Sequence, residues 1–109
     1  MNTLEYHVLL ALASGPQYGY AISEAIATDS GGAVEPRAGS LYRVIARLIS
    51  ARLVSEAEPD EPPPPHPGHA RRYYALTAAG RRALSAEALR LRQRAALAER
   101  RIGAITGRS

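Results

Sequence analysis

The sequence predicts a mainly α-helical fold with a small β-hairpin and one long C-terminal helix. Three observations support this prediction. Apolar residues recur at helical spacing in three segments separated by Gly and Pro, two short alternating segments flank a proline-rich stretch, and a heptad pattern ends the chain. A chain of 109 residues suffices for one domain with a modest core and an appendage. We therefore expect a domain over residues 1–76 and a C-terminal helix over residues 77–109.

The composition excludes several kinds of chemistry. There is no Cys, so disulfides, thiolate metal sites and thiol catalysis are unavailable, and the core must form without Phe or Trp. All of the positive side-chain charge is Arg, and a net charge of +4 favours polyanionic partners such as nucleic acid. No segment approaches the ~20 apolar residues of a membrane span, and the N-terminus lacks a signal-peptide pattern. We therefore expect a soluble cytoplasmic protein with no membrane partner.

Capping residues and apolar spacing predict the first two helices. Asn2 and Thr3 can cap a helix that ends at the Ser-Gly-Pro sequence of residues 14–16. A second helix is expected from about residue 18 to residue 29, before the Ser-Gly-Gly sequence of residues 30–32. The apolar residues expected to face inward from these helices are Leu4, Val8, Leu12, Ile22, Ala25 and Ile26.

The segment from Glu35 to Leu53 predicts a third helix with two different faces. Pro36 and Gly39 break the chain ahead of it, and it is expected to end near Ala51. One face is aliphatic, with Leu41, Ile45, Leu48 and Ile49. The opposite face carries Ser40, Arg43, Arg47 and Ser50. Because arginine can bond a guanine edge or a phosphate with two N–H groups, this helix suits a DNA groove. An ordinary amphipathic helix with a solvated polar face is the alternative.

Two short strands are expected over residues 53–58 and 71–76, joined by a proline-rich tip over residues 59–70. Proline cannot donate to a strand ladder, so this stretch belongs at the tip of a hairpin. Three helices followed by a hairpin is the order of a winged helix-turn-helix domain. Tyr73 and Tyr74 could contact a ligand or DNA. The alternative that we favour places one ring in the core and the other over the sheet.

The last helix is predicted to begin after Thr77 as its N-cap and to carry an apolar seam. The seam residues, spaced alternately by four and three, are Leu84, Ala88, Leu91, Ala95, Ala98, Ile102 and Ile105. A heptad seam is typical of helices that pair along their length, so we expect a homodimer through this helix. The alternative is packing onto the first helix of the same chain, and Leu84 is expected to touch the domain in either case.

Several short motifs together resemble the PadR family of transcriptional regulators. They are Gly15-Pro16, Gly19-Tyr20, Gly39-Ser40-Leu41-Tyr42, Arg47-Leu48, Leu53-Val54 and the run Arg-Tyr-Tyr-Ala-Leu-Thr-Ala-Ala-Gly of residues 72–80. The resemblance covers roughly residues 4–84, and the single C-terminal helix is similar to that of the family's shorter subgroup. It implies a winged helix with a dimerisation helix, and ligand-responsive repression from a palindromic operator.

The resemblance also assigns contacts with double-stranded DNA. It places the third helix in the major groove, with further contacts from the start of the second helix and from the wing, which is the predicted hairpin with its proline-rich tip. The implied DNA-binding residues are Ser40, Tyr42, Arg43, Arg47, Tyr18, Tyr20, Arg71 and Arg72. Within the proline-rich tip, we expect only His66 and His69 to lie near DNA. Arg43 stands where many relatives have proline. The acidic residues of the wing (Glu56, Glu58, Asp60 and Glu61) would repel phosphate, so we expect that part to point away from DNA.

No arrangement of residues predicts catalysis. A Ser-His-Asp set, a phosphate-cradling glycine loop and paired carboxylates are all missing from the pattern. We expect no cofactor, and a metal site at His66 and His69 is disfavoured because a proline loop does not orient ligands. A small-molecule effector of unknown identity stays open as a partner. The sequence thus predicts a DNA-binding repressor, with a winged-helix protein-interaction module that no longer reads DNA as the alternative.

Overall fold

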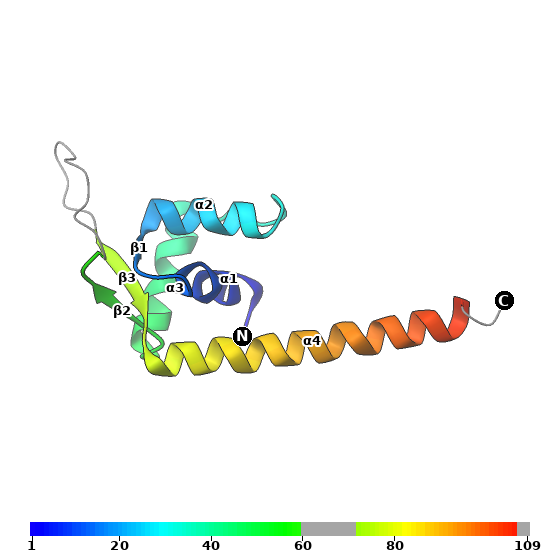
Figure 1. Cartoon of the computed structure of the whole chain (residues 1–109). Coiled ribbons are helices and arrows are strands. Elements are labelled where there is room, and N and C mark those ends of the chain that lie inside the picture. The colour runs from blue at the N-terminus through cyan, green and yellow to red at the C-terminus, as the bar shows by residue number, and fades with distance from the viewer. Residues whose placement is uncertain (60–71, 107–109) are drawn as a thin grey trace.

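The computed structural model describes residues 1–59 and 72–106, with side chains as far as Gly103. The predicted wing tip, with His69 and Arg71, lies almost wholly outside these residues, and so does the side chain of Ile105. The described elements are α1 (Thr3–Leu12), β1 (Gln17–Tyr18), α2 (Gly19–Asp29), α3 (Ala38–Ser50), β2 (Val54–Ala57), β3 (Tyr73–Leu76) and α4 (Ala78–Thr106). Helices α1 to α3 form a compact domain with the sheet at one end, and α4 runs past it and projects well beyond it (Figure 1).

Helix α1 begins with a complete capping box, as the cap prediction requires. The backbone N–H of Glu5 donates to Oδ1 of Asn2 at 2.8 Å, and the backbone N–H of Asn2 donates to Oε1 of Glu5 at 2.9 Å. Two N–H groups without a helical partner are satisfied in this way, and the Glu5 carboxylate lies at the positive end of the helix. Its place at the start of α1 is therefore fixed by local chemistry.

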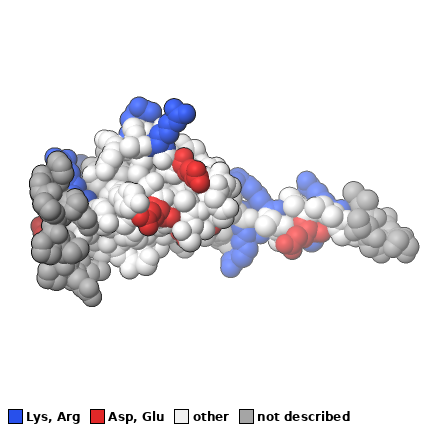
Figure 2. Space-filling model, turned by 90° about the horizontal axis from the view of Figure 1, so that it is seen from above, with Lys and Arg blue, Asp and Glu red and all other residues white. Residues whose placement is uncertain are grey.

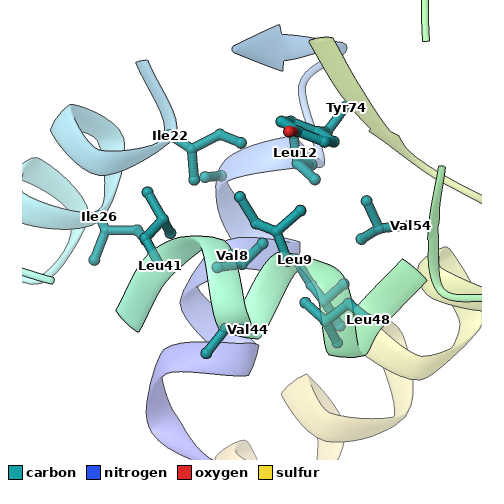
Figure 3. Close-up of a cluster of buried hydrophobic side chains, with 12 residues drawn as sticks. Val8, Leu9, Leu12, Ile22, Ile26, Leu41, Val44, Leu48, Val54 and Tyr74 are labelled. Carbon is teal, nitrogen blue, oxygen red and sulfur yellow. The ribbon is translucent and has the colours of Figure 1, made fainter. Parts of the chain in front are cut away.

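The core is formed by aliphatic side chains from all three short helices, closed by the sheet (Figure 3). The buried hydrophobic residues are Val8, Leu9, Ala11, Leu12, Ile22, Ile26, Leu41, Val44, Ile45, Leu48, Val54 and Tyr74. The predicted inward faces of the three helices are confirmed, although Leu4 and Ala25 are only partly buried against the core. Helix α3 shows two further differences. Val44 joins the buried face of α3 although the apolar pattern did not single it out, and Ile49 is only partly buried.

The sheet has three antiparallel strands in the order β1-β3-β2, where the sequence predicted a two-stranded hairpin. Gln17 pairs with Tyr74 and Tyr18 with Tyr73, so the chain leading into α2 supplies the third strand. Tyr74 is buried, while the ring of Tyr73 packs edge-on against Tyr18 with centroids 5.6 Å apart. The expectation of one core ring and one ring covering the sheet is confirmed.

Helix α4 is attached to the domain by its first turn. Thr77 is the predicted N-cap, because Oγ1 accepts from the backbone N–H of Gly80 at 2.9 Å, and the same hydroxyl donates to the carbonyl of Arg52 at 2.7 Å. The backbone N–H of Thr77 donates to the carbonyl of Leu53 at 3.1 Å. Arg52 reaches this contact in the left-handed region, with φ of 63°. These bonds set the direction in which α4 leaves the domain.

Gly80 lies directly on the backbone of Leu53, and a Cβ at this position would collide with the carbonyl oxygen of Leu53. We expect Gly80→Ala to lower the free energy of unfolding by about 2 kcal/mol, because the backbone cannot move aside without breaking the bonds of Thr77. Gly103→Ala is the matched control, since nothing lies within 4 Å of its added Cβ. It should stabilise the helix slightly. Urea unfolding of both variants checks this, and equal stabilities would contradict the close contact.

Candidate nucleic-acid interface

The outward face of α3 combines two arginines with small residues. Arg43 and Arg47 are exposed, and so are Gly39, Ala46 and Ser50. Nη2 of Arg43 donates to Oγ of Ser40 at 3.3 Å, so the hydroxyl of Ser40 holds one end of this guanidinium. Small neighbours leave room for another surface to approach the helix backbone. Ser40 itself is partly buried, which makes it a support for Arg43 more than an independent contact.

Arg47 lies at the edge of this face that borders α1. Its Nε is 3.7 Å from Oε2 of Glu5, the residue that also caps α1. The sequence pattern did not predict this ion pair, because the two residues are far apart in the chain and on different helices. Both arginines nevertheless remain open to solvent, and a group of arginine side chains projects from one edge of the domain in Figure 2.

The N-termini of α2 and α3 lie side by side and share an electrostatic property. Neither helix has a side-chain cap or an acidic residue in its first turn, in contrast to α1. Uncapped N-terminal N–H groups with the positive end of the helix dipole favour an anion such as phosphate. A shallow hollow joins the two N-termini. It is lined by Gly19, Tyr20, Ser23, Ala38, Leu41 and Tyr42.

Tyr20 and Tyr42 rise from this pair of helix ends, with 66% and 50% of their surfaces exposed. A hydrogen bond with Glu24, one turn further along α2, raises the pKa of Tyr20 above its ordinary value. The Tyr42 ring lies against Gly19, where an added Cβ would meet its hydroxyl. Tyr18 is partly buried against Tyr73.

The exposed Arg37 at the start of α3 belongs to the same surface. None of the sequence motifs singled it out, because it precedes the apolar pattern of the helix. Its position at the uncapped N-terminus adds a positive charge to a place that already favours an anion.

The root of the wing is less favourable to an anion. Nη1 of Arg72 is 3.5 Å from Oε1 of Glu56 across the sheet, and both side chains are exposed. An exposed pair of this kind contributes little to stability, but it partly neutralises Arg72. Glu58 is exposed nearby. Of the predicted wing contacts, Arg72 is thus the only one within the described part of the chain, since Arg71 and His69 fall outside it.

The structure divides the predicted seam of α4 into two parts. Leu84 packs against the core, as expected, and Leu91 lies beside the start of α1 in the same chain. The other seam residues with described side chains are exposed: Ala88, Ala95, Ala98 and Ile102. Leu89 and Leu97 are exposed, and they were not part of the predicted seam. The proximal seam residues Leu84 and Leu91 therefore lie against the chain's own domain, while the distal seam residues Ala95, Ala98 and Ile102 are exposed.

A hollow of about 360 Å³ lies where α1 meets α4. Glu87 lies at its edge with only 6% of its surface exposed, and its Oε1 accepts from Nε and Nη2 of Arg90 at 2.8 and 2.6 Å. The hydrogen bond from Arg90 lowers the pKa of Glu87, and Arg94 acts in the same direction. His7 lines the same hollow, and its Nδ1 is buried without a hydrogen-bond partner among the described residues.

Neither a metal centre nor a membrane span is found over the ranges 1–59 and 72–106. No group of three His, Cys, Asp or Glu residues in these ranges is arranged to hold a metal ion. No helix in them has the length and apolar character needed to cross a membrane.

The domain is a winged helix-turn-helix whose third helix presents an arginine-bearing face, with a long helix appended. Residues 8–86 match the model of the Transcriptional regulator PadR-like family, so the chain belongs to this family. An uncharacterized 37.1 kDa protein in transposon TN4556 of Streptomyces fradiae is 42% identical over 87 residues, which are 80% of this chain and 22% of that protein. The chain thus spans about a fifth of the length of this curated relative.

Solved structures agree with this fold. A PadR family transcription regulator from Clostridium difficile superposes with a TM-score of 0.75 and 20% identity, covering 94% of this chain and 100% of that chain. Bacillus subtilis PadR in complex with operator DNA has a TM-score of 0.63 and 19% identity, covering 77% of this chain and 45% of that chain. At these identities the likeness concerns the fold.

The lowered pKa of Glu87 gives a prediction about stability and pH. A carboxylate with a lowered pKa stabilises the fold above the ordinary carboxyl pKa, and this contribution is lost as pH falls through the lowered value. We expect Glu87→Gln to reduce the free energy of unfolding at pH 7 but to have little effect at a pH below the lowered pKa, where the carboxyl group is protonated. Denaturant unfolding at both pH values measures the difference. Glu99→Gln on the exposed part of α4 is the control, and an identical pH profile for both variants would contradict the role of Glu87.

Proposed function

We propose that this chain is a transcriptional repressor that binds a palindromic operator in double-stranded DNA as a homodimer. The observation that carries the proposal is the surface around α3, which combines exposed Arg43 and Arg47 with the uncapped N-termini of α2 and α3. This surface offers positive charge, bidentate donors and room for a close backbone approach at one place. Membership in a family of transcriptional regulators supports it.

Each part of this surface has a distinct task. Helix α3 enters the major groove, where Arg43, supported by Ser40, reaches a base edge. The N-termini of α2 and α3, which lie beside Tyr20 and Tyr42, bind phosphates and fix the register of the domain on the duplex. Arg72 adds a weaker contact because Glu56 partly neutralises it. The match of the fold to a PadR protein solved with operator DNA supports DNA as the partner of this chain.

A single domain of this size grips only one short half-site, so a second copy is needed for a palindrome. Two α3 helices in successive major grooves must lie about 34 Å apart. Helix α4 has 29 residues and a length of about 43 Å at 1.5 Å per residue, and its distal part projects beyond the domain (Figure 1). The distal seam of Ala95, Ala98 and Ile102 is the surface on which we place the second copy.

Arg43→Ala tests the docking face. The probe is the duplex that the wild-type chain selects from a random-sequence library. We expect the variant to lose about 1–3 kcal/mol of binding free energy, roughly 5- to 150-fold in affinity, with an unchanged melting temperature. For the wild type, the slope of log affinity against log salt concentration should be steep. In Arg43→Ala, the magnitude of this slope should fall by about one if Arg43 contacts a phosphate instead of a base.

Arg101→Ala is the matched control, since it removes the same charge from the exposed end of α4. It should leave affinity for the selected duplex almost unchanged. Equal effects of the two substitutions would reject α3 as the reading helix. Failure of the wild-type chain to select any duplex, or binding without salt dependence, would favour the protein-interaction module instead.

Ala98→Asp tests the dimer. A carboxylate in the middle of the distal seam would be buried without a partner, so we expect monomers in sedimentation and at least tenfold weaker binding to the selected duplex. Gln93→Asp lies on the opposite side of the same helix and introduces the same negative charge there. This control should remain dimeric. Dimeric Ala98→Asp protein would show that the copies meet elsewhere.

A further inference from the structure

The carboxylate of Glu5 serves two helices at once. Its Oε1 accepts the backbone N–H of Asn2 and closes the capping box of α1, while Oε2 lies 3.7 Å from Nε of Arg47 on α3. The side chain of Glu5 is 22% exposed and that of Arg47 is 57% exposed. The cap fixes the acid in place, so a rigid negative charge stands beside an exposed guanidinium on the surface that we propose to face DNA.

The geometry of this ion pair leaves the terminal nitrogens of Arg47 free of Glu5, so that they can bind a further acceptor. The ion pair approaches Arg47 at Nε, and arginine carries further N–H donors on its two terminal nitrogens. An ion pair this long and this exposed contributes almost nothing to the stability of the free protein. Its effect should grow when DNA covers it, because excluding water strengthens the attraction between the two groups.

We propose that Glu5 is a positioning residue that makes Arg47 selective for DNA sequence. Building on the proposed function, Glu5 restrains the guanidinium at the α1 edge of α3, so that its terminal nitrogens meet a base edge in one orientation. The same negative charge offsets the attraction of Arg47 for phosphates on any sequence. Arg47 paired with Glu5 thus contributes to specific binding and little to non-specific binding. Arg43, whose guanidinium bonds to the uncharged hydroxyl of Ser40, contributes to both.

A double-mutant cycle of Glu5→Gln and Arg47→Ala tests the coupling. Gln also serves as the acceptor of a capping box, so the first variant removes the charge and keeps the cap. The two probes are the duplex selected by the wild-type chain and a scrambled duplex of the same length. We expect Glu5→Gln to weaken binding to the selected duplex and to tighten binding to the scrambled one. The ratio of the two affinities should fall about tenfold when Arg47 is present and hardly change when the chain also carries Arg47→Ala.

Glu35→Gln separates this effect from a general loss of negative charge. Glu35 is exposed just before α3, and its removal should change both affinities alike and leave their ratio unaltered. An unchanged ratio for Glu5→Gln, or the same fall with and without Arg47, would overturn the coupling while leaving the DNA-binding function standing. A wild-type chain with no preference for its selected duplex would overturn both. Melting curves of each variant exclude misfolding as the cause.

Discussion

The fold depends on the burial of one face of α3. Leu41, Val44, Ile45 and Leu48 belong to one core cluster with the aliphatic side chains of α1 and α2, against which α3 packs. Figure 3 shows Leu41, Val44 and Leu48 within this cluster. Removing these side chains from water is the main favourable contribution that the domain's small core can make. The same burial leaves the opposite face of α3 outside, with its arginines exposed. Stability and the presentation of the candidate interface thus follow from the same interaction.

Around α3, the electrostatics of the helix ends are unequal. Helix α1 begins with a side-chain cap and an acidic residue, whereas α2 and α3 begin with neither. The uncapped ends lie together and the capped end lies at the border, where Glu5 reaches Arg47. This arrangement favours an anion over α2 and α3 and discourages one at the start of α1. The attraction for anions therefore differs across this surface, whereas a uniform basic patch would attract them equally everywhere.

The position of α4 follows from a small number of backbone contacts. Thr77 bonds to the turn at Arg52 and Leu53, and Gly80 lets the helix lie on that turn. Farther along, Leu84 packs against the core and Leu91 lies beside the start of α1, and then the helix leaves the surface. A fixed exit is what a dimer needs if its two α3 helices are to keep a defined spacing.

Local chemistry made much of this structure predictable. Caps, apolar periodicity and Gly-Pro breaks gave the helices and the core, because each depends on residues a few positions apart. Strand β1 was missed because two residues show no alternation. Val44 was missed because it borders the polar face, next to Arg43 and Arg47 on the helix wheel. The pair of Glu5 with Arg47 and the division of the α4 seam depend on which segments meet in space, which periodicity does not reveal.

The most direct test of DNA reading by α3 is an amide NMR titration of the chain with its selected duplex. If α3 enters the groove, the largest shifts will fall on the first turns of α2 and α3 and on the outward residues of α3 from Gly39 to Ser50. Shifts confined to α4 or to the base of the wing, with α3 unaffected, would contradict this role.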